Sequence, residues 1–187
     1  MTGGPLYDSP RALLAALALT AKERVALAPS RTGALTGSWR GVRLASEHDP
    51  AREARLFVEA QGIPPGAHVA LYGLGLGHHL RPLLDAVGPE GRVAAAEATA
   101  APVAAALEAC PDPAVFDDPR LEAVAAADEK TFLARWARAF ASLDPGRTKV
   151  VIHLPSLQAA PPDWRGTVNA LELIRMERRF PLVLGGV

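Results

Sequence analysis

Residues 68–80 constrain the fold of this chain more than any other stretch. A short apolar run from His68 to Tyr72 leads into three glycines, Gly73, Gly75 and Gly77, and a helical pattern follows at once. Glycine is needed where the backbone turns sharply or passes close to another group, because a Cβ would clash there. A strand that ends in such a loop and opens a helix directs backbone N–H groups at one point, which suits an anionic or ribose-bearing ligand. The pattern therefore predicts a binding crevice at this loop.

The spacing of the glycines bears on the kind of ligand. It reads Gly-x-Gly-x-Gly, and His78 stands where the dinucleotide fingerprint has its third glycine. This departure favours the related loop of S-adenosylmethionine (SAM) type Rossmann folds over a nicotinamide site. Methyltransferase loops usually carry an acidic residue two positions before the first glycine, and Leu71 occupies that position here, which counts against a methyltransferase. The glycines are also compatible with tight packing in a sheet that binds no ligand.

Two acidic residues follow later strand-like runs. Glu97 ends the run 92–96, and an acidic residue about 20 positions beyond the glycines is where such folds hydrogen-bond ribose hydroxyls. A solvated carboxylate at a strand end is the alternative for Glu97. Asp128 follows the apolar segment 121–127, where methyltransferase-type folds place a contact to the adenine amine. An N-cap of the next helix is the preferred interpretation of Asp128.

Strand and helix patterns alternate from residue 68 onward. The expected strands are 68–72, 92–96, 121–126 and 149–154, and the expected helices are 79–87, 101–109, 129–141 and 163–179. This alternation is the signature of a parallel sheet with right-handed crossovers. The sequence therefore predicts an α/β, Rossmann-like (methyltransferase-like) fold, with a mostly parallel sheet and flanking helices.

The N-terminal part has a different pattern. A helix is expected from about Pro10 to Leu27, capped by Asp8 or Ser9, and a short hairpin over 31–45. We therefore divide the chain into an appendage, 1–45, and a Rossmann-like domain, 46–187. A further helix should begin at Asp49-Pro50, with Asp49 as its cap, and end by Gly62.

Composition excludes several classes of function. The 20 basic and 20 acidic residues balance, so no global field attracts nucleic acid or a membrane surface. No stretch reaches the ~18 uncharged apolar residues that span a bilayer. Residues 12–21 are apolar like a signal core, but their helical spacing and the sparse positive charge before them favour a helix of the mature protein. The single cysteine, Cys110, forms no internal disulfide, which fits a reducing, cytoplasmic protein.

No catalytic or metal-binding set stands out, so the catalytic residues are unknown at this point. His78 and His79 are adjacent, and neighbours on a helix point about 100° apart, so we expect no metal site there. We interpret a histidine at this helix start as a ligand-facing donor or a packing residue. Ser156 follows the fourth strand, but no nucleophile-elbow pattern surrounds it, and Cys110 has no obvious base near it in sequence.

Two segments together resemble a known family. Residues 46–54 (SEHDPAREA) and 73–80 (GLGLGHHL) are similar to motifs in the N-terminal Rossmann-like domain of bacterial motility accessory factor proteins. These are flagellin glycosyltransferases grouped with pterin-diphosphokinase-like proteins, and His78 stands where the family usually has tyrosine. The resemblance covers roughly residues 30–180. It implies a hairpin, the Asp-Pro helix and then the sheet, in a setting of flagellar or surface glycosylation.

The family carries its sugar-transferase activity in a following domain, for which this chain of 187 residues has no room. We therefore expect a stand-alone or truncated accessory domain that binds a nucleotide, a protein partner or a missing C-terminal domain, or that forms homo-oligomers through residues 182–187. The alternative is a small SAM-dependent methyltransferase. In that case Gly73, Gly75, Gly77 and His78 would hold SAM or S-adenosylhomocysteine (SAH), with Glu97 on the ribose and the 153–160 loop on the substrate. Methyl transfer needs little beyond positioning the reactants.

Overall fold

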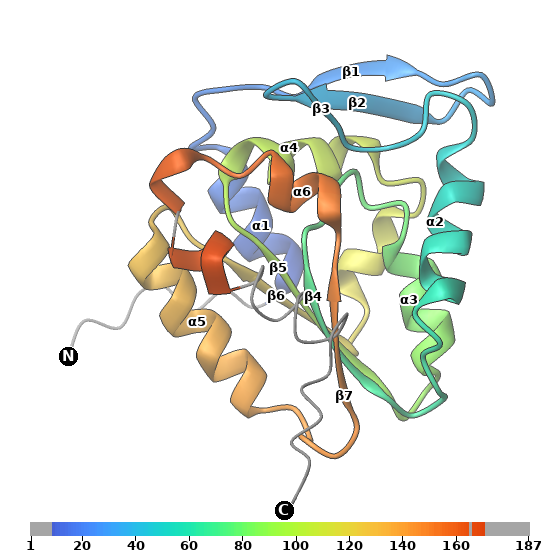
Figure 1. Ribbon diagram of the computed structural model, residues 1–187, viewed down its shortest axis with the longest axis vertical. Helices are drawn as coiled ribbons and strands as arrows, with labels where there is room; N and C mark the ends of the chain where they lie inside the picture. The colour runs from blue at the N-terminus through green and yellow to red at the C-terminus, as the bar shows by residue number, and fades with distance from the viewer. Residues whose placement is uncertain (1–8, 165, 171–187) are drawn as a thin grey trace, which may run out of the picture.

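A four-stranded parallel sheet forms the centre of the molecule (Figure 1). The computed structural model describes residues 9–164 and 166–170. The strands lie in the order β6-β5-β4-β7, with bounds β4 His68–Tyr72, β5 Arg92–Glu97, β6 Leu121–Ala125 and β7 Thr148–Ile152. The chain moves outward from β4 to β6 and then returns to the other side of β4. A topological switch point therefore lies between β4 and β7, which is where open α/β sheets bind ligands.

Helices cover both faces of this sheet, so the predicted fold class is confirmed. The α-helices are α1 Pro10–Ala18, α2 Pro50–Ala60, α3 Leu80–Val87, α4 Ala100–Ala109, α5 Glu129–Ala141 and α6 Leu154–Gln158, and the 3-10 helices are η1 Pro113–Asp117 and η2 Pro162–Trp164. α1 to α4 pack on one face, and α5 packs on the other (Figure 1). The caps follow the sequence pattern, because Ser9 and Asp49 accept backbone N–H groups at the starts of α1 and α2.

The two faces of the sheet have different side chains because residues alternate along a strand. Val69 and Leu71 of β4 point to the face that α1 to α4 cover. The opposite face presents small alanines from β4 and β5, and these pack against large aromatic residues such as Phe132 and Trp164. Small strand residues thus leave the room that the aromatic side chains fill.

A second, antiparallel sheet precedes the central one. Its strands are β1 Ala26–Pro29, β2 Leu35–Trp39 and β3 Val42–Arg43. Trp39 and Leu44 of this region pack against α4 and against Leu76 of the glycine loop. The N-terminal sheet therefore forms one wall beside the switch point.

Two predicted boundaries are wrong. The first helix ends at Ala18 instead of about Leu27, and Leu27 pairs with Gly37 in the N-terminal sheet. A tertiary strand pairing thus overrides the helical spacing of the apolar residues there. The last strand ends at Ile152, and 154–158 forms α6, with Pro155 in its first turn.

Some predictions lie outside the described residues. They concern Asp8, the proposed oligomer segment 182–187 and most of the helix expected over 163–179. Within the described part, 162–164 forms a 3-10 turn and 166–170 is helical. None of the helices in the described ranges is long and apolar enough to cross a membrane.

Candidate functional site

The glycine loop lies at the switch point, where β4 and β7 end side by side. The His153 N–H donates to Tyr72 O at 2.8 Å, and the Gly73 N–H donates to Ala96 O at 2.8 Å. All three loop glycines have positive φ values, which L side chains rarely adopt. The loop conformation therefore depends on glycine, as the sequence predicts.

The space next to each loop glycine is filled by another side chain of the same protein. A Cβ at Gly73 would lie 2.6 Å from Ser156 Cβ, and one at Gly75 would lie 2.8 Å from His153 Cε1. At Gly77 the nearest atom is Cys110 Cβ, also at 2.8 Å. These contacts favour the packing interpretation of the glycines, and ligand binding by the loop stays a prediction.

Glu97 lies beneath this loop and is only 1% exposed. Its Oε2 accepts the Leu74 N–H at 3.0 Å, and its Oε1 accepts the Ala98 N–H at 2.9 Å. The Ser156 hydroxyl adds a hydrogen bond to the same carboxylate. Burial raises the pKa of Glu97 to about 7. The interpretation of Glu97 as a solvated carboxylate is therefore wrong, and its contact with a ribose remains untested.

Two imidazoles stand above this buried carboxylate. His79 and His153 stack with ring centroids 5.0 Å apart and an angle of 27°. His79 Nε2 bonds to Gly73 O at 3.0 Å, and His153 Nδ1 bonds to Ser156 Oγ at 2.9 Å. Burial lowers the pKa of His79 to about 4 and that of His153 well below its ordinary value. Both rings are therefore neutral near pH 7.

His78 contacts the N-terminal sheet, and its role toward a ligand stays a prediction. Its Nε2 bonds to Leu35 O of the N-terminal sheet at 2.8 Å, and the residue is 6% exposed. Its Nδ1 is buried and has no hydrogen-bond partner among residues 9–164 and 166–170. Burial also lowers the pKa of His78. Within these ranges no group of three or more histidine, cysteine or acidic side chains is placed to hold a metal ion.

Asp128 follows β6, a strand that lies on the far side of β5 from β4 and its glycine loop. Its Oδ1 accepts the Thr131 N–H at 2.9 Å and caps α5, so the preferred interpretation is confirmed. The Thr131 N–H also lowers the pKa of Asp128. An adenine contact by Asp128 remains a prediction.

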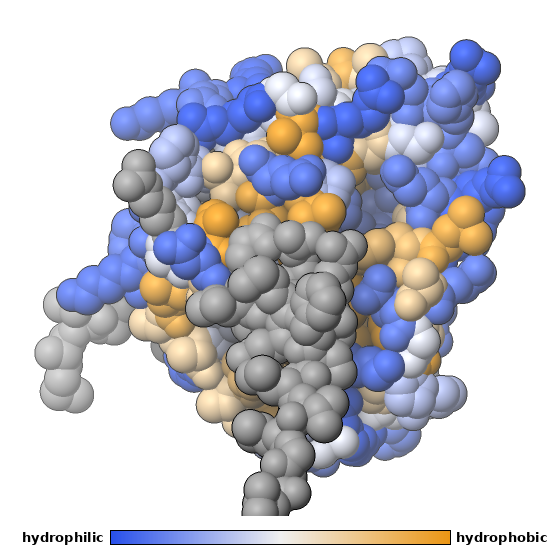
Figure 2. All heavy atoms as spheres, viewed as in Figure 1, coloured by the Kyte–Doolittle hydropathy of each residue, from blue (hydrophilic) through white to orange (hydrophobic). Residues whose placement is uncertain are grey.

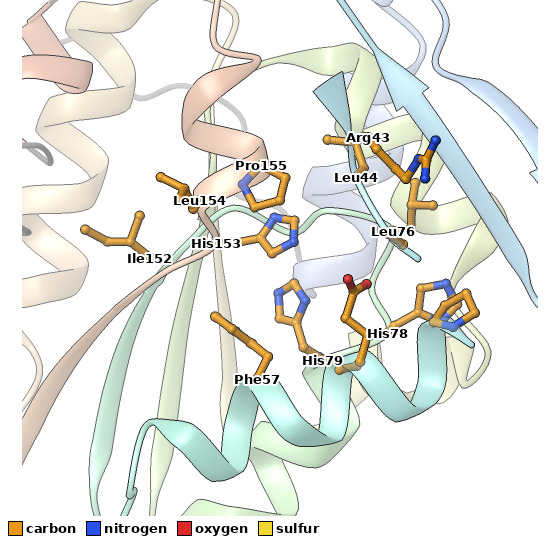
Figure 3. Close-up of a pocket in the computed structure, with 14 residues that line it drawn as sticks. Arg43, Leu44, Phe57, Leu76, His78, His79, Ile152, His153, Leu154 and Pro155 are labelled. Atoms are coloured by element: carbon orange, nitrogen blue, oxygen red, sulfur yellow. The ribbon is translucent and has the colours of Figure 1, made fainter. Parts of the chain in front are cut away.

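A pocket of about 330 Å³ opens beside the stacked imidazoles (Figure 3). Its walls come from the N-terminal sheet, α2, the glycine loop and the β7–α6 junction. The lining residues are Arg43, Leu44, Ala45, Pro50, Glu53, Ala54, Phe57, Leu76, His78, His79, Ile152, His153, Leu154 and Pro155. The sequence predicts a crevice at the glycine loop and the 153–160 loop, and residues of both line this pocket. The walls from the N-terminal sheet and α2 were not predicted, because tertiary packing brings them there.

Hydrophobic side chains also gather on the surface of the molecule. Figure 2 shows hydrophobic side chains beneath the N-terminal sheet, in the region where Figure 1 places α6, with hydrophilic residues around them.

Comparison with known proteins supports the fold. The sequence matches no protein-family model and no curated protein. Among solved structures, the MAf glycosyltransferase from Magnetospirillum magneticum AMB-1 aligns with a TM-score of 0.52 at 15% identity, over 94% of this chain and 34% of that one. This similarity reaches both sheets of the present chain, and at such low identity it concerns the fold alone.

Two other structures align less well. A protein-L-isoaspartate O-methyltransferase has a TM-score of 0.37 at 14% identity, over 70% of this chain and 34% of that one. A cyclopropane-fatty-acyl-phospholipid synthase-like protein from Lactobacillus casei ATCC 334 has a TM-score of 0.33 at 21% identity, over 45% of this chain and 32% of that one. The chain thus spans about a third of the length of these three structures.

Proposed function

We propose that this chain is a Rossmann-like accessory domain of the kind that the glycosyltransferase similarity suggests, and that its glycine loop serves packing instead of cofactor binding. The domain then acts through a protein partner, another domain or a second copy of the chain. We place it in the cytoplasm and expect it to bind neither nucleic acid nor a membrane. The proposal assigns no transferase reaction to the residues described.

The observation that carries this proposal is the filled space over the loop. The His153 ring lies against Gly75, and the Ser156 side chain lies against Gly73. A ribose or phosphate at the same place would have to displace both side chains. It would also have to compete for Glu97, whose two oxygens already accept backbone N–H groups.

The second candidate is a SAM-dependent methyltransferase. One observation favours it: Glu97 stands at the carboxyl end of β5, next to the switch point, as a ribose-binding carboxylate would. This function requires α6 to move away from the loop, so that SAM or SAH replaces His153 and Ser156.

A thermal-shift screen with SAM, SAH and CMP-, UDP- and GDP-type nucleotides separates the two candidates. A ligand present at 100 times its Kd adds about 2.7 kcal/mol to stability. For a chain of this size that corresponds to an increase in Tm of roughly 5–10 °C. We expect no such increase with any of these compounds.

A matched variant, Ser156→Gly, tests whether the side chain over Gly73 is what excludes the ligand. A clear shift of the wild-type protein with SAM or SAH would favour the methyltransferase and overturn the accessory-domain proposal. An increase in Tm with a CMP-, UDP- or GDP-type nucleotide would also overturn the packing role of the loop.

A further inference from the structure

The pocket beside the glycine loop has the features of a small-molecule site. Its volume of about 330 Å³ falls in the range of roughly 300–1,000 Å³ that is usual for ligand pockets. Nine of its lining residues are apolar: Leu44, Ala45, Pro50, Ala54, Phe57, Leu76, Ile152, Leu154 and Pro155. His153 belongs to its wall, and the same ring fills the space over Gly75.

The hydrogen bonds of the two stacked imidazoles fix which groups they offer to a ligand. Because a carbonyl oxygen only accepts, His79 carries its proton on Nε2, toward Gly73 O. Above pH 7 Glu97 is ionised and its carboxylate only accepts. The Ser156 hydroxyl then donates to Glu97, so Ser156 Oγ accepts the Nδ1–H of His153. His153 therefore keeps a lone pair on Nε2, and the pocket wall presents a hydrogen-bond acceptor.

The charged residues of the pocket wall do not favour an anion. Arg43 is ion-paired with Glu47, and Glu53 accepts the Ser46 N–H at 2.7 Å. The Glu53 carboxylate also places a negative charge on this wall. A phosphate or carboxylate ligand would therefore find no unpaired cation among the lining residues.

Aromatic rings give the pocket a preference for flat ligands. Phe57 meets His79 edge to face at a centroid distance of 5.5 Å and meets His153 at 6.0 Å. The three rings thus form one aromatic wall, which Figure 3 shows on one side of the pocket. Aromatic molecules gain from offset or edge contacts with such a wall.

We propose that this pocket binds a small, flat, uncharged aromatic molecule that carries an N–H group, and that the N–H donates to Nε2 of His153. The proposal is independent of the proposed function, because it concerns the pocket and leaves the glycine loop filled.

Indole and benzofuran form a matched pair of probes. Both are flat, uncharged and bicyclic, and they differ in that indole has an N–H where benzofuran has an oxygen. We would titrate the full chain, labelled with ¹⁵N, with each probe at pH 8, where Glu97 is ionised, and follow the backbone amide signals. Indole should shift signals from residues 43–57, 76–79 and 152–155 and should bind at least about fivefold more tightly than benzofuran, as expected for one net hydrogen bond.

Variants of α2 and β7 test the same contacts. Phe57→Ala should weaken both probes, whereas Leu56→Ala, at the neighbouring exposed position outside the pocket, should weaken neither. His153→Phe keeps a ring but removes its nitrogens, so it should abolish the preference for indole. Equal affinities of the two probes, signal shifts confined to other regions, or no binding of indole up to its solubility limit would each overturn the proposal.

Discussion

The imidazole of His153 occupies the place into which a side chain at Gly75 would project, since a Cβ there would lie 2.8 Å from His153 Cε1. This contact joins the end of β7 to the loop that follows β4. At the switch point of the sheet, the space directly over Gly75 is thus filled by a side chain of the same protein.

The variant Gly75→Ala tests this close approach. Gly75 has a φ of +52° and Gly62 a φ of +55°, but a Cβ at Gly62 has no atom within 4 Å. Alanine at either position costs about 1–2 kcal/mol for the left-handed backbone. Gly75→Ala should lose a further ~1–3 kcal/mol, because the His153 ring must shift. Urea unfolding measures both losses.

A third variant shows whether the ring is responsible. In a His153→Ala background the additional loss at Gly75 should largely disappear, while the loss at Gly62 should not change. Equal losses for the two glycine variants in the wild-type background would show that His153 does not restrict this position.

The sequence predicted the parallel sheet well because local patterns determine it. Residues 150–152 of β7 are all β-branched, and the glycines after Tyr72 are needed at positive φ. The caps Asp49 and Asp128 were also predictable, since an N-cap depends on neighbouring residues alone.

The burial of Glu97 at the candidate site was not predictable in the same way. Whether Glu97 faces solvent or lies beneath the loop depends on the position of Ser156, which is 59 residues later in the numbering. The predicted length of the first helix was wrong for a similar reason, because Leu27 pairs with Gly37 across the N-terminal sheet. Contacts between distant segments decide both features, and no local pattern reports them.

Glu97 should make stability depend on pH between about 4.5 and 7. Burial raises its pKa from 4.5 to about 7, so the folded protein binds more protons than the unfolded chain in this range. The contribution of Glu97 is therefore fully present below pH 4.5 and is lost as the pH rises through about 7. From pH 5 to pH 8 this loss should be roughly 2 kcal/mol.

The control for this pH dependence is the variant Glu97→Gln, whose side chain does not titrate. This variant should be less stable at pH 5, because an amide offers only one acceptor oxygen to the N–H groups of Leu74 and Ala98. The gap between wild type and variant should narrow toward pH 8, as measured by chemical unfolding at each pH. A gap that stays constant would contradict the raised pKa.

His79 should have the opposite effect on the acid side. Burial lowers its pKa from 6.5 to about 4, so the unfolded chain binds more protons in this range. Its contribution is present above pH 6.5 and is lost as the pH falls toward 4, by about 3 kcal/mol at pH 4. His79→Gln keeps an N–H donor for Gly73 O and does not titrate, so it should show a smaller loss on acidification. An identical loss in both proteins would exclude His79 as the source.

Phe132 should contribute strongly to the stability of the core on the face of the sheet that α5 covers. It is fully buried and meets Tyr72, Trp136 and Trp164 at centroid distances of 6.4, 5.2 and 5.2 Å. Phe132→Ala should lose about 3–5 kcal/mol of unfolding free energy, because a cavity would form among these rings.

Phe140 provides the control on the same helix, α5, since it is 42% exposed. Phe140→Ala should lose less than about 1 kcal/mol, as a surface substitution does. Because Tyr72 is the last residue of β4, the cavity at Phe132 should also loosen the strand end that carries Gly73. Hydrogen exchange of the Gly73 and Leu74 amides should therefore be faster in Phe132→Ala and unchanged in Phe140→Ala. If both variants lost the same stability and the exchange of these amides did not change, the aromatic cluster would have no special role in holding the switch point.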